Sequence, residues 1–225
     1  MAATIHPIHL GFDQVYIIRD EGTVMVDGGI PGKFRVFERA LETVGMDPRD
    51  LQLMIITHGH WDHIGCASEI KEFTEAKIAM HHLDREGLEK PLKFMPPGVN
   101  AWGVFLEKAA TLFLPFVHYP PATVDLLIGD EGMSLEEYGI AGRVIHTPGH
   151  SPGSISVLLE SGEAFVGDLA MNTFFLRYGP NLPVFAQDLS QVKESWRLLL
   201  KEGARTIYPA HGEPFPADVI RAAVS

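Results

Sequence analysis

The sequence predicts a mixed α/β (α+β) fold in one domain that spans residues 1–225. Short runs of branched aliphatic residues, typical of buried strands, alternate with stretches whose apolar residues recur at helical spacing. A strand–helix rhythm fills the first part of the chain, and a second group of strands follows from residue 124. A chain of 225 residues is long enough for one good-sized core, and no linker, internal repeat or low-complexity tract divides it.

The first part of the chain supplies a hairpin and two strand–helix units. In chain order we expect strands at 15–18 and 23–26, a helix between Pro31 and Gly45, a strand at 51–56, a helix from Asp62 to about Phe73 and a strand at 77–80. Asp62 suits the N-cap of its helix because a carboxylate there can accept the free backbone N–H groups of the first turn. Cys66 falls inside the same helix, where we expect it to pack as a small buried hydrophobe.

Residues 85–121 interrupt this rhythm and form a predicted helical insertion. Aromatic and aliphatic residues recur there at helical spacing from Trp102 to Phe116, and the pattern is broken at Pro115. The apolar stripe is wider than that of a simple amphipathic helix. We therefore favour either a cap that supplies an apolar wall to the substrate site or a homodimer contact over ordinary core, with a membrane-surface anchor last. His118 is a candidate substrate contact at the mouth of such a cap.

The second part of the chain returns to strands and ends with a helix and one more strand. We expect strands at 124–128, 142–146, 154–159, 163–167 and 206–208, and a helix with Leu189, Val192, Trp196 and Leu199 on one stripe that ends near Gly203.

Composition limits the kinds of partner. The formal net charge of −11 and the lack of a Lys/Arg-rich run argue against a nucleic-acid-binding protein, which needs a basic face. The single cysteine, Cys66, excludes an internal disulfide and is typical of the cytoplasm. The chain opens without a signal-peptide pattern, and no apolar run reaches the roughly 18 residues of a membrane span. We expect a cytoplasmic protein without a nucleic-acid partner or a membrane span.

Three histidines and an aspartate lie within six positions, directly after the apolar run at 51–56. They are His58, His60, Asp62 and His63. Imidazole and carboxylate groups suit zinc, iron or manganese. Four such groups on one strand-to-helix turn are more than one open catalytic metal site needs, so the pattern favours two metal ions.

This stretch resembles the His-x-His-x-Asp-His signature of the metallo-β-lactamase superfamily. Four further motifs of that family follow the same order along the chain: Val24 to Gly29, Thr147 to Ser154 with His150, Phe165 to Asp168, and Tyr208 to Gly212 with His211. Together the five motifs cover nearly the whole chain. The resemblance implies an αββα sandwich of two similar halves, with 85–121 as an insertion.

The resemblance also implies a metal-dependent hydrolase with two zinc ions, for which iron or manganese are alternatives. By this resemblance His58, His60 and His150 hold one ion, Asp62, His63 and His211 hold the other, and Asp168 bridges both. A bridging hydroxide would attack the substrate carbonyl, with Asp62 as the proton shuttle. Asp27 would orient the ligand loop through hydrogen bonds.

The substrate is less defined than the metal centre, and the sequence favours a small ester, lactone or thioester with an apolar part. Glyoxalase II members add a C-terminal helical domain beyond the position of His211. Acyl-homoserine lactonases carry tyrosine where this chain has Met171. Arg177 and Tyr178, in the loop after Asp168, are candidate substrate contacts.

Two alternatives to a dinuclear hydrolase stay open. Persulfide dioxygenases keep the motif yet use one iron, held by residues matching His58, His150 and Asp168. The remote alternative is a metal-binding module without catalytic activity. The pair His81-His82 at a strand end is a further but weaker candidate for contact with metal or substrate.

Overall fold

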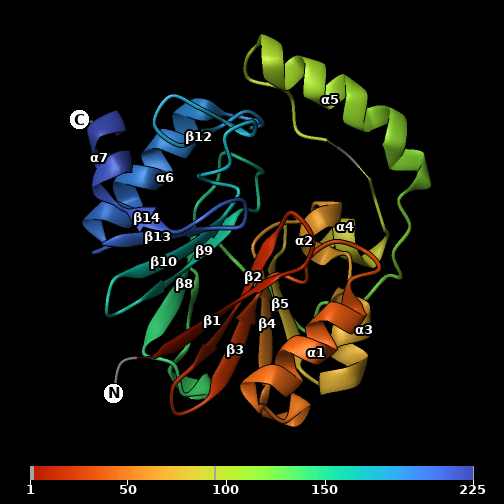
Figure 1. Cartoon of the computed structure of the whole chain (residues 1–225). Coiled ribbons are helices and arrows are strands. Elements are labelled where there is room, and N and C mark those ends of the chain that lie inside the picture. The colour runs from red at the N-terminus through yellow and green to blue at the C-terminus, as the bar shows by residue number, and fades with distance from the viewer. Residues whose placement is uncertain (1–2, 94, 225) are drawn as a thin grey trace.

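Two β-sheets lie face to face in the centre of the molecule, and helices cover their outer faces (Figure 1). The structure, a computed structural model, describes residues 3–93 and 95–224. The first sheet has the order β1-β2-β3-β4-β5-β6, with strands Thr4–His9, Gln14–Arg19, Thr23–Val26, Leu53–Ile56, Lys77–His81 and Leu126–Ile128. The second has the order β14-β13-β10-β9-β8-β7, with strands Phe215–Pro216, Thr206–Pro209, Glu163–Gly167, Ile155–Leu159, Gly142–His146 and Met133–Ser134. A separate two-stranded ribbon pairs β11 (Arg177–Tyr178) with β12 (Leu182–Pro183).

The helices fall into an outer layer on each side and one outlying helix. In chain order they are α1 (Phe34–Val44), α2 (Trp61–Ile64), α3 (Ala67–Thr74), α4 (Arg85–Glu89), α5 (Ala101–Phe113), α6 (Leu189–Lys201) and α7 (Asp218–Val224), with 3-10 turns at Pro48–Asp50, Leu114–Phe116 and Glu136–Tyr138. Helices α1 and α3 lie on the outer side of the first sheet, and α6 and α7 on that of the second (Figure 1). The predicted α/β sandwich of αββα type is confirmed.

Alternation along the strands explains why four layers form. Successive side chains of a strand point to opposite faces of its sheet. In β2, Val15 and Ile17 pack into the cluster beneath α1 and α3, whereas Tyr16 and Ile18 pack into the cluster between the two sheets. A third cluster, centred on the buried Trp196 of α6, fills the space between the second sheet and its helices. Three apolar clusters thus separate four layers.

Parallel pairing brings the ends of several strands to one edge. Strands β3, β4, β5 and β6 pair in parallel, with α1, then α2 and α3, then the segment of α4 and α5 in their crossovers. Strands β10 and β13 also pair in parallel, with α6 in their crossover. The carboxyl ends of parallel strands meet at the same edge of a sheet, where functional groups of open α/β sheets gather.

The expected strands and helices are present within a few residues of their predicted ends, but two local predictions are wrong. The helix from Asp62 to about Phe73 is broken into α2 and α3, because the Gly65 and Cys66 N–H groups bond to the carbonyls of Gly29 and Gly28 instead of continuing one helix. Asp62 is not the N-cap either. His60 occupies that position in extended conformation, and Asp62 lies in the first turn. Cys66 is buried as expected.

The insertion contains α4, α5 and the 3-10 turn around Pro115, and its long helix stands apart from the four layers (Figure 1). Gly103 is the buried residue of α5, so this helix is not ordinary core.

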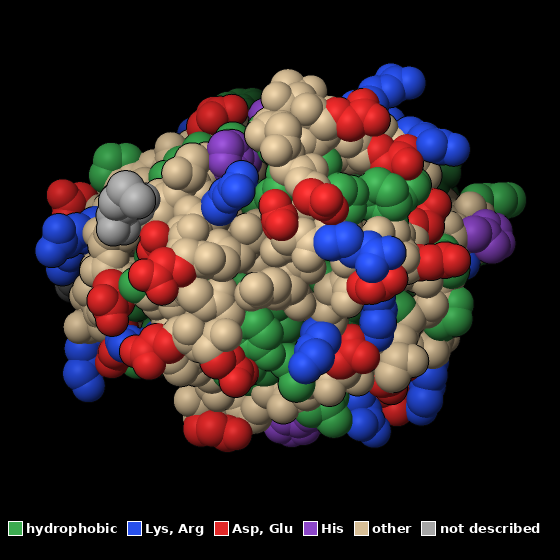
Figure 2. Space-filling view, turned by 90° about the horizontal axis from the view of Figure 1, so that it is seen from below, with side chains coloured by type: hydrophobic (Ala, Val, Ile, Leu, Met, Phe, Trp, Pro, Cys, Tyr) green, Lys and Arg blue, Asp and Glu red, His purple; other side chains and the backbone are tan. Residues whose placement is uncertain are grey.

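No helix within the described residues combines the length and apolar character that crossing a membrane requires. The face seen in Figure 2 carries interspersed acidic and basic side chains rather than a continuous basic patch. One domain over 1–225 stays a prediction.

Candidate metal centre

The predicted ligand residues all lie in the segments that follow the carboxyl ends of strands. His58 and His60 follow β4, and Asp62 and His63 belong to α2 directly after them. The other three come from the second sheet: His150 from the β8–β9 loop, Asp168 directly after β10, and His211 after β13. The fold therefore brings together seven side chains that are up to 153 residues apart in sequence.

His58, His60 and His150 form a first trio, whose nitrogen atoms lie within 4.8 Å of one another. Nδ1 of His60 faces Nε2 of His150 at 3.0 Å. All three side chains are buried. Such a group of imidazoles could hold one divalent metal ion.

Asp62, His63 and His211 form a second trio with the same spacing limit. Nε2 of His211 lies 3.7 Å from Asp62 Oδ2, and Nε2 of His63 lies 4.0 Å from Asp62 Oδ1. The two histidines are buried, whereas the Asp62 side chain is 15% exposed. This trio could hold a second ion and leaves one carboxylate accessible.

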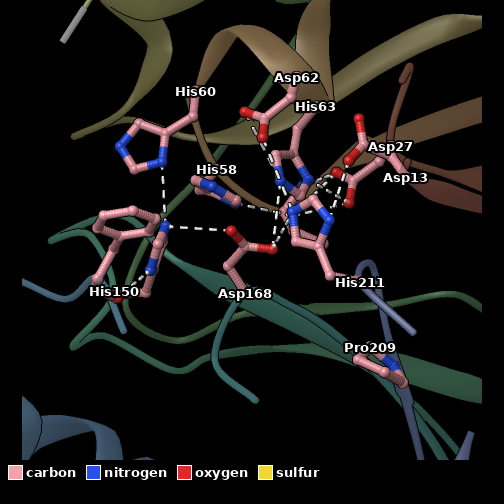
Figure 3. A network of polar contacts seen from close by, with 12 residues as sticks. Asp13, Asp27, His58, His60, Asp62, His63, His150, Asp168, Pro209 and His211 are labelled. Atoms are coloured by element: carbon pink, nitrogen blue, oxygen red, sulfur yellow. Dashed lines mark hydrogen bonds and ion pairs between the residues drawn. The ribbon is translucent and has the colours of Figure 1, made fainter. Parts of the chain in front are cut away.

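Asp168 lies between the two trios and presents one oxygen to each (Figure 3). Its Oδ1 is 3.3 Å from His63 Nε2 and 3.2 Å from His211 Nε2. Its Oδ2 is 3.6 Å from His150 Nε2. A carboxylate in this position can serve both trios at once.

Buried carboxylates orient the histidines of the second trio. Nδ1 of His63 bonds to Asp27 Oδ2 at 3.0 Å, and Nδ1 of His211 lies 3.0 Å from Asp13 Oδ1. Asp27 also accepts the N–H and hydroxyl of Thr57, the residue before His58. Its φ of 64° is unusual for a residue other than glycine, and such strain collects at functional sites. These are the contacts expected of an aspartate that orients a ligand loop.

The rings of the first trio have similar partners. His150 Nδ1 bonds to the Phe185 carbonyl at 2.9 Å, and His58 Nδ1 lies 3.1 Å from the Thr57 hydroxyl. His58 and His150 thus turn Nε2 towards the centre, whereas His60 turns Nδ1 towards Nε2 of His150. Nε2 of His58 is buried and has no hydrogen-bond partner among the described residues. Buried polar atoms seldom stay unpaired, and metal-bound histidines usually donate their other N–H to a carboxylate or carbonyl, so this donor set fits metal ions.

The five histidines fall into two groups according to the direction in which their pKa values are shifted. Burial, reinforced by neighbouring rings, lowers the pKa of His58 and of His60 well below the ordinary value, and burial lowers the pKa of His150. Burial alone would also lower the pKa of the other two, but the Asp168 carboxylate and its neighbours raise the pKa of His63 well above normal and that of His211 to about 9.

Asp168 and Asp13, two of the acidic groups near His211, have pKa values that are shifted in opposite directions. Burial would raise the pKa of Asp168, yet His211 and His63 hold it well below the usual range. Burial raises the pKa of Asp13 well above normal. In the metal-free protein, the raised pKa values favour protonated His63 and His211. A metal ion must displace these protons to bind, because a histidine ligand has to be neutral.

A cavity of about 350 Å³ opens over the seven side chains. His60, Asp62, His150, Asp168 and His211 form its floor. Helix α5 supplies one apolar wall, and the segment after β10 supplies another; the residues are Leu106, Ala109, Ala110 and Phe113 from α5, and Met171, Phe175, Leu176 and Phe185 from the second segment. The long helix of the insertion therefore borders the site.

The candidate substrate contacts Arg177, Tyr178 and His118 are not among the residues that line this cavity. Arg177 donates to Asn181 Oδ1 at 3.2 Å, and Tyr178 packs with the cluster of the second sheet. His118 is exposed and contacts the Phe116 carbonyl. Met171, in contrast, is a buried wall residue of the cavity.

His81 lies in a second cluster with His146 and Asp130, outside the main site. The rings of His81 and His146 stack with centroids 4.2 Å apart and planes 11° from parallel. A metal ion normally lies in the plane of each imidazole that binds it, and two stacked, nearly parallel rings do not share such a position. His82 contacts the Ile128 carbonyl. The cluster is better described as a packed histidine pair bonded to Asp130.

A family model described as the metallo-beta-lactamase superfamily matches residues 11–211. The chain belongs to this superfamily. The predicted family and the predicted class of enzyme, a metallo-hydrolase, are thereby confirmed.

Similar proteins within the metallo-beta-lactamase superfamily include both named enzymes and solved structures. A probable metallo-hydrolase of Methanocaldococcus jannaschii is 27% identical over 202 residues, which cover 88% of this chain and 86% of that protein. The hydroxyacylglutathione hydrolase GloC of Haemophilus influenzae is 29% identical over 59% of this chain and 56% of its own length. TTHA1623, whose crystal structure is of a di-iron-bound form, superimposes with a TM-score of 0.67 at 26% identity and covers 95% of this chain and 96% of that one.

Proposed function

We propose that this protein is a dinuclear metal-dependent hydrolase of small esters, lactones or thioesters with an apolar part. The observation that carries the proposal is the position of Asp168, which presents one oxygen to each of two ligand trios. His58, His60 and His150 would hold one ion, and Asp62, His63 and His211 the other. The di-iron-bound form of TTHA1623, which is 26% identical to this chain, supports two metal ions.

The bound ions would supply Lewis-acid activation of water and of the substrate carbonyl. The chain supplies the orientation of the ligands and the movement of protons. Asp62 borders the cavity and its side chain is partly exposed, so its carboxylate can pass a proton to a leaving group within the cavity. Asp168 is 5% exposed and contacts histidines of both trios, which suits a bridging ligand more than a proton carrier.

The walls of the cavity favour an uncharged acyl substrate. Most of the lining side chains are apolar, and among the described residues that line the cavity none is a lysine or arginine. A substrate whose recognition depends on several carboxylates, such as a glutathione thioester, would find no cationic partner there. An apolar acyl chain would instead gain from burial against α5, and the same walls exclude water from the reacting carbonyl.

Metal content per chain, measured by elemental analysis on protein purified without added metal, tests the proposal first. Two zinc ions per chain support it and direct a screen of lactones, esters and thioesters of graded chain length. One iron per chain contradicts the dinuclear assignment and directs assays to persulfide oxidation with oxygen uptake. Two metals without turnover of any of these substrates support a binding module instead.

A further inference from the structure

We propose that Asp84 positions the first trio by joining the loop of His58 and His60 to the loop of His150. This inference rests on the proposed function, because it concerns how the chain holds one of the two metal sites. Asp84 lies in the turn between β5 and α4, is 5% exposed, and does not line the cavity. Its carboxylate hydrogen-bonds to residues of the two ligand loops that are not themselves predicted ligands.

The carboxylate of Asp84 accepts hydrogen bonds from both loops. Its Oδ2 accepts the Gly59 N–H at 3.1 Å and the Ser151 hydroxyl at 2.6 Å. Its Oδ1 accepts the Gly153 N–H at 2.9 Å. Gly59 lies between His58 and His60, and Ser151 directly follows His150. The first loop leaves the first sheet and the second loop leaves the second, so one buried side chain connects the two halves at the trio.

Gly59 and Gly153 pack so closely against Asp84 that the two ligand loops have little room to move relative to it. A Cβ at Gly59 would come within 2.6 Å of the Asp84 carbonyl oxygen, and a Cβ at Gly153 within 2.6 Å of Asp84 Oδ1. Real Cβ atoms do not approach other atoms so closely, so both positions need glycine for the loops to reach Asp84. The two ligand loops thus meet at van der Waals contact around one carboxylate.

Asp84 differs from Asp27 and Asp13 in the groups that its carboxylate contacts. Asp27 and Asp13 contact the rings of His63 and His211, which belong to the second trio. Asp84 holds the backbone on either side of the first trio. Loss of Asp84 should therefore weaken one metal equivalent and spare the other, which a general loss of folding would not do.

The test is the variant Asp84→Asn, followed by zinc titration of metal-stripped protein in a calorimeter. The amide has one oxygen and one NH₂ group, so in either orientation its NH₂ faces the N–H of Gly59 or of Gly153. We expect one of two zinc equivalents to bind roughly 10- to 100-fold more weakly, the usual effect of altering a group that supports metal ligands. Ser151→Ala removes one of the three contacts and should produce a smaller change in the same equivalent.

Asp125→Asn is the matched control. Asp125 accepts the N–H of Ile78 at the opposite end of β5 and bonds to Lys71, remote from the trios. This variant should keep both zinc equivalents. Asp13→Asn should weaken the other equivalent, and the double variant with Asp84→Asn should weaken both. Thermal unfolding of each variant, checked by circular dichroism, confirms that the protein is folded.

The outcomes separate this inference from the proposed function. Wild-type protein that binds fewer than two metals overturns the dinuclear assignment, and the inference with it. Wild-type protein that binds two metals, beside an Asp84→Asn variant that binds both with unchanged affinity, overturns only the role of Asp84. An equal weakening of both equivalents in Asp84→Asn would also overturn that role, since it would indicate a structural rather than a positioning residue.

Discussion

Asp168 is the residue on which both trios converge, with Oδ1 at 3.2 Å from His211 Nε2 and Oδ2 at 3.6 Å from His150 Nε2. If it serves both ions, Asp168→Ala should weaken the metal affinity of both sites by more than the roughly 10- to 100-fold that changes outside the ligand set cause, and the occupancy of both should fall. Activity should fall with occupancy. Elemental analysis of purified variant and wild type measures this. Metal content equal to wild type would contradict the bridging role.

His211 gives the metal-free protein a stability that depends on pH. Its pKa is about 9 in the fold, against 6.5 for a free histidine, because Asp168 and Asp13 outweigh the opposite effect of burial. A group whose pKa is raised by folding stabilises the fold fully below the unfolded pKa and loses that contribution as pH rises through the folded value. The unfolding temperature of metal-free protein should therefore fall by several degrees between about pH 6.5 and 9.

Metal-loaded protein is the control for this pH series. A bound cation replaces the proton on His211, so the loaded protein should not show the same fall. The thiol of Cys66, whose pKa burial raises to about 11, does not titrate within this range. An unfolding temperature of metal-free protein that rises from pH 6.5 to 9 would show that His211 is not held protonated in the fold.

At the scale of elements, α5 presents different residues to the cavity and to solvent. Leu106, Ala109 and Ala110 border the cavity and are partly buried, whereas Leu112 is 73% exposed and Phe105 is 60% exposed. The apolar stripe read from the sequence therefore has two faces. The first supports the interpretation of 85–121 as a cap. The second keeps the prediction of a homodimer contact open, because exposed apolar patches commonly mark interfaces.

Ala109→Phe tests the cap by placing a large side chain in the cavity wall. Substrates with long acyl chains should lose contact with that wall, and each methylene kept from burial costs about 0.8 kcal/mol. Loss of two such groups should lower kcat/KM roughly tenfold for long chains, with little change for the shortest. Lys108→Phe, which adds the same ring at the exposed neighbouring position, should leave the preference unchanged. Identical chain-length profiles for both variants would leave packing or dimerisation as the role of α5.

Sequence patterns predicted the elements whose boundaries depend on neighbouring residues. They failed where a boundary depends on contacts with residues far away in the sequence. The hairpin at β2 and β3 follows from alternation and a turn within a dozen residues. The break between α2 and α3 depends on the carbonyls of Gly28 and Gly29, more than 30 residues away, and no local pattern records it. The strands of two residues, such as β11, are too short to show periodicity.

At the scale of the whole molecule, some residues of the site could likewise be predicted from local motifs, and others are brought there only by the fold. The seven predicted ligand residues lie together in the structure, and each could be predicted because it stands in a recognisable motif. Asp13 and Asp84 were not predicted, since each is a single aspartate in a turn and only the fold brings it to His211 or to Gly59. Arg177 shows the reverse case: its chemistry suits a substrate, yet its guanidinium contacts Asn181 instead.

Each trio combines residues from both halves of the sandwich, so bound metal ions would stabilise the whole fold. His58 and His60 come from the first sheet and His150 from the second, while Asp62 and His63 come from the first and His211 from the second. Two bound ions would therefore join the halves at two points. Free metal at 100 times its Kd stabilises the native state by about 2.7 kcal/mol per site, or about 5 kcal/mol for two independent sites.

Removal of the metals should accordingly lower the unfolding temperature of this 225-residue chain by about 10–20 °C, since 1 kcal/mol corresponds to about 2–4 °C in a domain of this size. Thermal unfolding with and without a chelator, followed by circular dichroism, measures the difference. Asp168→Ala, which should bind both ions poorly, should show a much smaller change on chelation. Because both ions connect the same two sheets, the loaded wild type should unfold in one transition, and two separate transitions would show that the halves unfold independently.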